Sequence, residues 1–473
     1  MADLATADAP LMLSVSGCRG IVGASLTPAV AARFGAAAAG WFGESATRKP
    51  PTVVLACDGR LGGQAIARTV AGALAAHGCH LVELGVATTP TAGLMVRHLE
   101  ADGGIVITAS HNPAEWNGLK IIDRTGAAPP AASAARIIEA FHADAASPVP
   151  WDRVGTVSQR TDGPEIHSAR VVEALGTVFD ASRIASRSFH AVLDAVNCSG
   201  GPAMHLLLER LGVRLTPVHA DGSGRFPHAP EPIADHLTSL SEAVVAHSAS
   251  IGLAQDPDAD RLALVDERGR FIGEEYTLAL AAEAILRFAG GHTHTLVANL
   301  STSRMIDDIA ARHGATVHRS RVGEANVVER MRGATAILGG EGNGGVIWPV
   351  VVDIRDSLGA AALVLALLAE RNEPLGTIVD AMPRYAMIKR KRSLDGIDPP
   401  AAIDAVAKAF ADAVLDRQDG VRADVELPGG GAGWVHVRPS NTEPIVRVIA
   451  EAPTEDIANE LASTAELQIG ARG

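Results

Sequence analysis

The sequence is poor in aromatic residues and in cysteine. Phe, Trp and Tyr make up 3% of its 473 residues, and there are only four cysteines. Cys18, Cys57, Cys79 and Cys198 are scattered along the chain with no CxxC spacing. This scatter argues against a zinc or disulfide framework and favours buried thiols in a reducing compartment.

Long apolar runs are also missing. Runs such as 363–368 are too short to span a bilayer. The first ten residues carry Asp3 and Asp8 instead of a basic segment followed by a long apolar run, so we expect no signal peptide. These absences predict a cytoplasmic protein with no membrane partner.

Positive charge is in deficit. Lys and Arg number 41 against 54 Asp and Glu, which gives a formal net charge of −13. This balance argues against nucleic acid as a main partner, although a locally basic site can still bind an anionic substrate. Hydrophobic residues make up 47% of the chain, ample for several cores, and the length suggests three or four domains.

Strand-like and helix-like stretches alternate along most of the chain, which predicts an α/β fold with largely parallel sheets. The pattern runs through three rounds, each with a polar or glycine-rich loop after a strand, so we interpret the rounds as divergent copies of one unit. The expected strands are 51–56, 80–84, 104–107, 190–195, 250–254, 295–298 and 335–338. The tail differs, with a helix expected at 402–415 and antiparallel strands at 422–427, 433–437 and 445–450.

These patterns divide the chain into four domains. We expect three similar mixed or parallel-sheet α/β domains, followed by a smaller α+β domain at the C-terminal end. The expected domains are 1–155, 156–262, 263–382 and 383–473.

The first candidate site is the loop 108–113, Thr-Ala-Ser-His-Asn-Pro, which follows the apolar strand 104–107. Open α/β sheets usually place their chemistry at the carboxyl ends of strands, where Ser110 falls. A serine hydroxyl is a weak nucleophile until it is activated or modified, and His111 and Lys120 are near in sequence. A simple polar turn explains this hexapeptide about equally well.

The second candidate is the segment Asp256-Pro257-Asp258-Ala259-Asp260-Arg261, which follows the expected strand 250–254. In an extended loop the alternating carboxylates of Asp256, Asp258 and Asp260 project to one side. They repel one another unless a hard cation neutralises them, and Mg²⁺ prefers oxygen ligands. A surface turn is the alternative, and the strand in front together with Arg261 favours the metal site.

Three further stretches have side chains that suit a phosphorylated sugar. Ser440, Asn441 and Thr442 form a turn between Arg438 and Arg447 that suits a phosphate which is held but not cleaved, although a tight hairpin turn explains it equally well. Glu341 and Asn343, in the glycine-rich stretch 339–345, suit sugar hydroxyls. Arg19 lies between glycines, where a hairpin with a surface arginine is the likelier local structure.

Taken together and in order, these motifs resemble the α-D-phosphohexomutase family, which includes phosphoglucomutase, phosphomannomutase and phosphoglucosamine mutase. The motifs are TASHNP with Ser110, NGLK with Lys120, DPDADR at 256–261, GGEGNGG at 339–345 and RPSNTEP at 438–444. The resemblance implies four domains around a central cleft, with Ser110 as the phosphoserine. It also implies that Asp256, Asp258 and Asp260, with Ser110, hold Mg²⁺.

The same resemblance implies roles for the remaining residues. Arg19, His111 and Lys120 would serve phosphoryl transfer, Lys120 as a candidate general acid or base. Glu341 and Asn343 would bind the sugar, and Arg261 and Arg321 would face substrate. Arg438, Ser440, Asn441, Thr442 and Arg447 would hold the phosphate that does not react.

The sequence departs from the family pattern at several positions. Many members have a serine and then a histidine in the sugar loop, where this chain has Asn343 and Gly345. Asn441 replaces a common glycine, and Cys57 replaces a common arginine before Asp58. The GEGNGG form is most similar to the archaeal-type phosphoglucosamine mutase branch.

We therefore expect a phosphohexomutase that moves a phosphoryl group between O6 and O1 of a hexose phosphate. The expected reaction is glucosamine 6-phosphate to glucosamine 1-phosphate, with Mg²⁺ and a hexose 1,6-bisphosphate as activator and intermediate. Glucose or mannose phosphates are alternative substrates. A phosphatase and a non-catalytic sugar-phosphate-binding protein are alternatives of other classes. We expect a monomer or homodimer.

Overall fold

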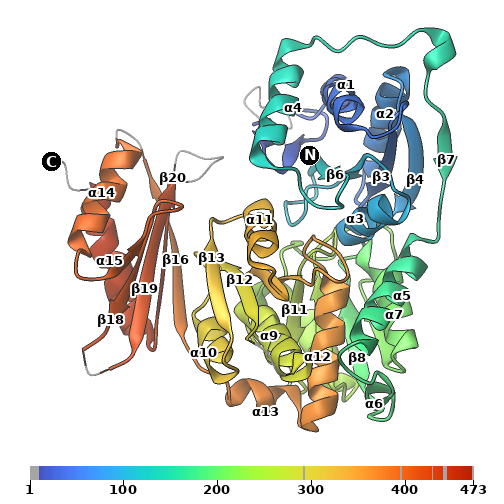
Figure 1. Ribbon diagram of the computed structural model, residues 1–473. Coiled ribbons are helices and arrows are strands. Elements are labelled where there is room, and N and C mark those ends of the chain that lie inside the picture. Colours follow the sequence, from blue (N-terminus) through green and yellow to red (C-terminus); the bar gives the residue numbers. More distant parts are fainter. Residues whose placement is uncertain (1–9, 291–292, 395–396, 429, 440–444, 471–473) are drawn as a thin grey trace.

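The structure is a computed structural model that describes residues 10–290, 293–394, 397–428, 430–439 and 445–470. Four β-sheets follow one another along the chain (Figure 1). The first sheet lies at the top right of the figure, the second and third lie below it, and the fourth stands at the left. The expected fold class, three α/β units and a C-terminal α+β module, is confirmed.

The first three sheets share one strand order. If the four strands of each are numbered along the chain, their spatial order is 4-3-1-2 in every case. The first three strands of each set are parallel, and the fourth is antiparallel to the third. This common topology explains why the sequence shows three rounds of one pattern.

The first sheet is the largest. Its four common strands are β3 (Thr52–Cys57), β4 (His80–Val86), β5 (Gly103–Ile107) and β6 (Trp116–Asp123). The hairpin β1 (Met12–Ser14) and β2 (Gly17–Ile21) extends it beside β6, and β7 (Val157–Gln159) extends it beside β4. Since β7 pairs with β4, this sheet continues past residue 155, where we expect the first domain to end.

The second and third sheets consist of the four common strands alone. The second contains β8 (His190–Asp194), β9 (Arg214–Val218), β10 (Ile251–Gln255) and β11 (Leu262–Val265). The third contains β12 (Thr295–Asn299), β13 (Thr316–Ser320), β14 (Leu338–Glu341) and β15 (Gly345–Ile347).

Helices cover these sheets on both faces. This is required because successive apolar side chains of a strand point to opposite faces of the sheet, and both sets are buried. In β3, Val53 and Leu55 pack in one apolar cluster with α1, α2 and α4, while Val54 and Ala56 face the other way, into the cluster that contains α3. The helices that follow the strands of the first two sheets are α1 (Pro28–Ser45), α2 (Gly63–Ala76), α3 (Thr89–His98), α4 (Ala131–Ala143), α5 (Gly163–Gly176), α6 (Ser182–Ala185), α7 (Gly200–Arg210) and α8 (Thr238–Ala246).

The largest apolar cluster joins the second and third sheets. It is centred on α12 (Ser357–Arg371), in which every residue from 357 to 369 is buried. A helix that is apolar on all sides must be covered on all sides, and here α5, α6, α7 and the helix 275–289 supply that cover together with β11 and β15 of the two sheets. The other helices of this region are α9 (Glu275–Ala289), α10 (Met305–Arg312), α11 (Glu324–Ala334) and α13 (Leu375–Asp380).

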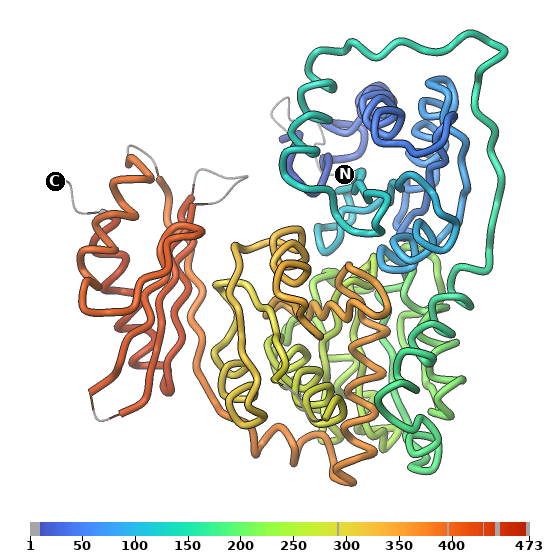
Figure 2. Tube along the Cα trace, in the orientation of Figure 1, coloured from blue at the N-terminus to red at the C-terminus, as the bar shows by residue number. Residues whose placement is uncertain are grey.

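The fourth sheet is antiparallel, and its helices pack in a separate cluster. Its strands are β16 (Ala386–Ser393), β17 (Val414–Asp416), β18 (Val421–Glu426), β19 (Ala432–Pro439) and β20 (Ile445–Ala452), and its helices are α14 (Pro399–Ala409) and α15 (Glu455–Gly470). Figure 2 shows this module beside the third sheet. Polar contacts join the two, since Arg422 donates to the Leu300 carbonyl at 2.7 Å and the His436 ring lies 2.9 Å from Ser301 Oγ.

Two element predictions were wrong. Residues 335–337 do not begin a strand, because α11 continues to Ala334 and Thr335 ends it in a left-handed conformation. The strand β14 instead includes Gly339 and Gly340, where a Cβ at Gly340 would lie 2.2 Å from the Gly345 carbonyl oxygen. The helix expected at 402–415 ends at Ala409 and is followed by β17.

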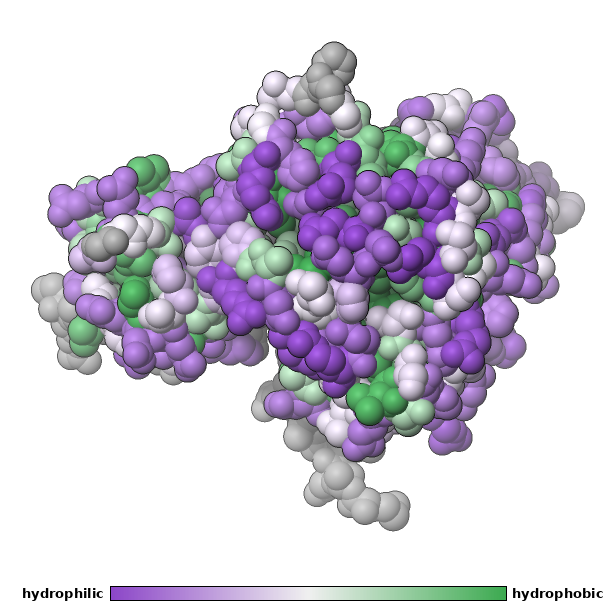
Figure 3. All heavy atoms as spheres, turned by 90° about the horizontal axis from the view of Figure 1, so that it is seen from below, coloured by the Kyte–Doolittle hydropathy of each residue, from purple (hydrophilic) through white to green (hydrophobic). Residues whose placement is uncertain are grey.

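No helix among the described residues is long and apolar enough to cross a membrane. The face of the molecule shown in Figure 3 is mostly hydrophilic, with apolar side chains in small separate patches. All four cysteines are buried and free, in agreement with the sequence prediction of buried thiols.

Candidate active site

One loop in each of the first three sheets carries the candidate chemistry, and it is the same loop each time. It connects the third strand to the antiparallel fourth: β5 to β6, β10 to β11, and β14 to β15. Each loop contains one residue with positive φ: Ser110 at 50°, Ala259 at 55° and Gly344 at 83°. For Ser110 and Ala259 this conformation is strained, and strain that persists in a fold is typical of functional loops.

The Ser110 hydroxyl points at the candidate metal loop, residues 256–261, which is called the metal loop below. Ser110 is buried, and its Oγ donates to Asp256 Oδ2 at 2.8 Å. His111 Nδ1 lies 3.4 Å from the same Oγ, and the Ser110 backbone N–H donates to Thr108 Oγ1 at 2.8 Å. The structure thus brings together two motifs that are 146 residues apart in the chain.

A buried ion pair supports the Ser110 loop from behind. Asp58 Oδ2 accepts from Arg60 Nε at 2.8 Å and from the Thr108 hydroxyl at 2.7 Å. The Arg60 guanidinium also donates to the carbonyls of Ser110 and Trp116. Neither Asp58 nor Arg60 was predicted as a site residue from the sequence, although their place directly after β3 was a usable signal.

Lys120 and Arg19 approach the loop from neighbouring strands. Lys120 is on β6, opposite Val106 of β5, and its Nζ lies 3.0 Å from Asp260 Oδ2 and 3.7 Å from Asp258 Oδ2. Burial opposes the charged form, but the carboxylates of Glu324, Asp260 and Asp258 outweigh it and raise the pKa of Lys120 above its usual value. Arg19, on β2, donates to Asn112 Oδ1 at 3.0 Å.

The three aspartates of the metal loop are fully buried, and their oxygen atoms lie within 4.8 Å of one another. Asp258 Oδ2 accepts from Thr89 at 2.6 Å and Asp260 Oδ2 accepts from Lys120, but Oδ1 of both residues has no hydrogen-bond partner. A buried carboxylate oxygen without a partner is costly. Hard oxygen donors this close to one another fit a divalent cation of the Mg²⁺ type.

The charges around this loop act on it unequally. Burial and the two neighbouring carboxylates raise the pKa of Asp256 well above its usual value. Burial also opposes ionisation of Asp260, but the charges of Arg355, Lys120 and Arg261 outweigh it and hold its pKa low. Asp256, which is beside Ser110, is therefore the carboxylate that most needs a further positive charge.

Arg355 connects the loops and was missed by the sequence analysis. Its guanidinium donates to Asp260 Oδ2 at 2.6 Å, to Glu341 Oε2 at 2.6 Å and to Glu324 Oε2 at 3.1 Å. Glu341 is buried, and its other oxygen accepts from Asn299 Nδ2 at 2.8 Å and from the Gly323 N–H at 2.9 Å. Glu341 therefore lies beside the metal loop with both of its oxygens engaged inside the protein.

Glycine in the third loop makes room for these charged side chains. A Cβ at Gly345 would lie 2.2 Å from Arg355 Cδ, and one at Gly342 would lie 1.8 Å from Glu275 Oε2. Any side chain at position 345 would therefore collide with the Arg355 side chain where it lies in this structure. Asn343 has a buried Oδ1 without a hydrogen-bond partner, an acceptor that a sugar hydroxyl could satisfy.

Arg261 and His111 complete the cluster. Arg261 is buried, its Nε has no hydrogen-bond partner, and its Nη1 lies 3.7 Å from Glu231. His111 Nε2 lies 4.0 Å from the same carboxylate. The charge of Arg261, together with burial and the charge of Arg19, lowers the pKa of His111 and so favours the neutral form of its ring.

The predicted phosphate-holding arginines are in the fourth sheet. Arg438 and Arg447 are paired across β19 and β20, with Lys391 of β16 next to Arg447. Arg438 donates to Asp419 Oδ2 at 2.9 Å, and the same oxygen accepts from the N–H of Val322, the residue after the exposed Arg321. Ser440, Asn441 and Thr442 lie outside the described residues.

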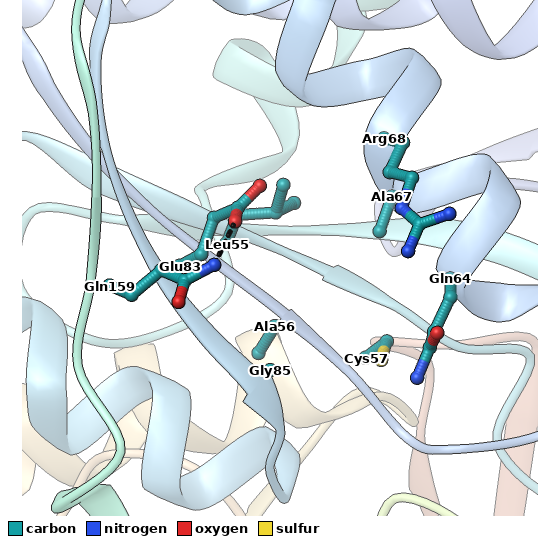
Figure 4. Close-up of a pocket in the computed structure, with 9 residues that line it drawn as sticks. All are labelled: Leu55, Ala56, Cys57, Gln64, Ala67, Arg68, Glu83, Gly85 and Gln159. Carbon is teal, nitrogen blue, oxygen red and sulfur yellow. Dashed lines mark hydrogen bonds between the residues drawn. The ribbon is translucent and has the colours of Figure 1, made fainter.

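A separate cavity of about 180 Å³ opens between β3, β4 and α2 (Figure 4). The side chains of Gln64, Arg68, Glu83 and Gln159 provide its polar groups, and Gln159 is hydrogen-bonded to Glu83. None of the sequence-predicted site residues lines it.

The chain matches all four domains described for phosphoglucomutase/phosphomannomutase. Residues 12–147 match alpha/beta/alpha domain I, 169–269 match domain II, 273–385 match domain III, and 388–467 match the C-terminal domain. The matches follow the order of the four sheets.

Whole-length relatives give the same result. A protein from Thermococcus kodakarensis named "Phosphoglucomutase/phosphomannomutase" is 35% identical, covering 94% of this chain and 95% of its own. A Methanopyrus kandleri protein named "Probable phosphoglucosamine mutase" is 33% identical, covering 94% and 95%. The crystal structure of a phosphoglucomutase/phosphomannomutase family protein from Burkholderia thailandensis superposes with a TM-score of 0.82 at 26% identity, covering 98% and 99%.

Proposed function

This chain belongs to the α-D-phosphohexomutase family and is an intramolecular phosphotransferase, and we propose that it exchanges a phosphoryl group between O6 and O1 of a hexose phosphate through a phosphorylated Ser110. One observation carries this proposal: the Ser110 hydroxyl is 2.8 Å from Asp256 Oδ2, at the edge of three clustered carboxylates. Phosphoryl transfer requires positioning and charge neutralisation around the transferred group, and this arrangement supports both.

Two half-reactions account for the exchange. In the first, the bond from phosphorus to Ser110 Oγ breaks, a new bond forms to the free hydroxyl of the hexose monophosphate, and that hydroxyl loses its proton. The product is a hexose 1,6-bisphosphate and free Ser110. In the second, the bond from phosphorus to the other sugar oxygen breaks and a bond forms to Ser110 Oγ. Ser110 Oγ gives up the proton that it gained in the first half-reaction, and the freed sugar oxygen takes a proton. The same bisphosphate, added externally, would phosphorylate a free enzyme.

The protein's own groups have distinct roles in this scheme. Lys120 is the proposed acid or base, and Arg19 and His111 assist at the phosphoryl group, all three near the Ser110 loop. Asp256, Asp258 and Asp260, with Ser110 Oγ, would hold Mg²⁺, supported by the two unpartnered carboxylate oxygens. A bound Mg²⁺ would neutralise charge on the phosphoryl oxygens.

Substrate binding is assigned to the remaining candidates. Glu341 and Asn343 are the proposed sugar ligands, and Arg261 and Arg321 are proposed to face substrate. Arg438, Ser440, Asn441, Thr442 and Arg447 are the proposed holders of the phosphate that does not react. Among these, the unpartnered atoms of Asn343 and Arg261 offer the clearest support, because each has capacity for a ligand hydrogen bond. The expected domain boundaries at residues 155, 262 and 382 stay predictions. So does the expectation of a monomer or homodimer.

We propose glucosamine 6-phosphate as the preferred substrate, with glucose and mannose phosphates as alternatives. The Methanopyrus name supports the first and the Thermococcus name supports the second. The test is kcat/KM for the three hexose phosphates, measured side by side with Mg²⁺ and the matching bisphosphate. A higher kcat/KM for glucose or mannose phosphate than for glucosamine phosphate would contradict the preference.

The same experiment separates a mutase from a phosphatase built on the same serine and metal. A mutase releases the isomeric hexose phosphate, whereas a phosphatase releases inorganic phosphate and free sugar. We expect the isomer to account for nearly all turnover. Family membership already disfavours a non-catalytic sugar-phosphate-binding protein.

A further inference from the structure

The three related sheets differ in the polar residue at the end of their first strand. In the second sheet this residue is a buried carboxylate that has no role in the proposed function. Asp58 after β3 accepts from Thr108 of the Ser110 loop, and Asn299 at the end of β12 donates to Glu341 of the third loop. Asp194 is the last residue of β8, the corresponding strand of the second sheet. It is 1% exposed, and its Oδ2 faces His228 instead of the metal loop.

The ring of His228 is oriented as metal-binding histidines are. Its Nδ1 lies 2.8 Å from the Ala229 carbonyl oxygen, which can only accept, so Nδ1 carries the proton. In the neutral ring the lone pair on Nε2 then points at Asp194 Oδ2, 2.9 Å away. Metal-ligating histidines commonly donate their other ring N–H to a backbone carbonyl in this way. Either a proton shared by the two atoms or a metal ion bound to both must therefore offset the repulsion between this lone pair and the carboxylate.

A second histidine completes a three-residue group. Ligand atoms of Asp194, His219 and His228 all lie within 4.8 Å of one another. His219 Nε2 is 3.1 Å from Ser239 Oγ, and the His219 backbone oxygen accepts from the Asn197 N–H at 2.6 Å. The second oxygen of Asp194 accepts from the Val196 N–H at 2.9 Å, which fixes the orientation of the carboxylate.

We propose that Asp194, His219 and His228 bind a transition-metal ion of the Zn²⁺ class, at a site distinct from that of Mg²⁺. Two imidazoles and one carboxylate suit Zn²⁺ and its neighbours, whereas Mg²⁺ prefers ligands that are all oxygen. Three protein ligands leave a further coordination position for water. The two sites therefore select different ions by donor type.

The position of the site indicates a structural role. His219 and His228 are at the two ends of one segment, and Glu231, three residues further on, faces His111 and Arg261. His236 Nδ1 contacts the Glu231 carbonyl at 2.7 Å and secures the other side of this turn. A metal ion bound to β8 and to both histidines would fix this segment against the second sheet, and with it the placement of Glu231.

The test is metal binding by the full chain, with a spectroscopic readout. Protein stripped with EDTA and returned to excess Mg²⁺ is titrated with Co²⁺, which reports ligand type by its visible absorption, and with Zn²⁺ by calorimetry. We expect one equivalent of Zn²⁺ to bind and to raise Tm. His228→Gln and His219→Gln should each weaken binding by at least about tenfold. His247→Gln, an exposed histidine outside the group, should bind as wild type does.

Two results would overturn the proposal. One is the absence of stoichiometric Zn²⁺ binding to the wild-type protein in the presence of Mg²⁺. The other is binding that persists in both histidine variants and disappears in Asp258→Asn, because the ion would then occupy the aspartate loop. The wild-type titration decides the matter even if a variant fails to fold. Since neither readout is activity, failure here leaves the proposed mutase reaction separately testable.

Discussion

The loops 108–113 and 256–261 leave equivalent strands of related sheets, yet they are stabilised in opposite ways. The Ser110 loop is supported from within its own sheet, because Asp58 and Arg60 form a fully buried ion pair directly behind it. The metal loop has one counter-charge of its own, Arg261, and takes the others from elsewhere, Lys120 from the first sheet and Arg355 from beyond the third. The backbone of the Ser110 loop is thus held by residues of its own sheet, whereas the charges that neutralise the three carboxylates come partly from other domains.

Charge explains this difference. A neutral hydroxyl is inexpensive to bury once it has a hydrogen-bond partner, but each buried carboxylate requires paired charge. Two carboxylate oxygens of the metal loop stay without a partner even so. We therefore expect the two loops to respond differently to substitution: the first through loss of a reacting atom, the second through loss of charge balance.

The largest effect is expected at the first loop. Ser110→Ala removes the proposed phosphoryl acceptor, so mutase turnover should fall at least about 1000-fold, about 4 kcal/mol in barrier, while Tm changes little. Ser168→Ala is the matched control, a buried serine in α5 whose Oγ donates to the Glu165 carbonyl; it should keep its activity. An Ser110→Ala enzyme that keeps a tenth of wild-type kcat would remove the phosphoserine from the mechanism.

The metal loop comes next. Asp258→Asn should weaken Mg²⁺ binding and lower kcat at saturating substrate by about 100-fold, because a charged ligand becomes a neutral one. Activity should disappear with EDTA in the wild type and return with Mg²⁺. Asp266→Asn, a buried carboxylate of the same sheet that pairs with Arg268 and Arg270, serves as control and should leave Mg²⁺ affinity unchanged. Equal Mg²⁺ affinity in wild type and Asp258→Asn would make the aspartate loop purely structural.

Arg355 tests the claim that the metal loop depends on distant charge. Arg355→Met leaves Asp260, Glu324 and Glu341 without their shared cation, so the free energy of unfolding should fall by about 3–5 kcal/mol. Arg268→Met removes a half-exposed arginine that also contacts carboxylates, and it should cost about 1 kcal/mol or less. Denaturant unfolding measures both values, and similar losses for the two variants would show that the buried network contributes no more than a surface pair.

The sequence pointed to candidate site residues, but not to all of the charged side chains that surround them in the fold. Ser110 and the three aspartates were singled out because their motifs follow apolar strands, and Glu341 because it lies in a glycine-rich stretch; both are local patterns in the sequence. Arg355 has no local signal: its three partners are 14, 31 and 95 residues away, and only the packed fold brings them together. The strand β14 was misplaced because two glycines in a row resemble a loop, although close packing against Met331 and Gly345 requires them.

The smallest effect concerns a carboxyl beside the third loop. Burial raises the pKa of Glu275 to about 8, so the folded protein holds a proton that the unfolded chain releases near pH 4.5. Stability from this group is therefore complete below that pH and is lost as pH rises towards 8. We expect Glu275→Gln to remove a decline of about 1–2 kcal/mol between about pH 6 and pH 8. Glu274→Gln is the neighbouring control, and an unchanged pH profile of the unfolding free energy in Glu275→Gln would contradict this assignment.

The most direct test of the account is to locate the phosphoryl group. The protein is incubated with hexose 1,6-bisphosphate and Mg²⁺, digested, and its peptides are analysed by mass spectrometry, with Ser110→Ala as the matched control. The account predicts that the peptide containing Ser110 gains the mass of one phosphoryl group, that fragmentation places it on Ser110, and that the group transfers to added hexose monophosphate. Phosphorylation at another residue, or equal labelling of the Ser110→Ala protein, would contradict it.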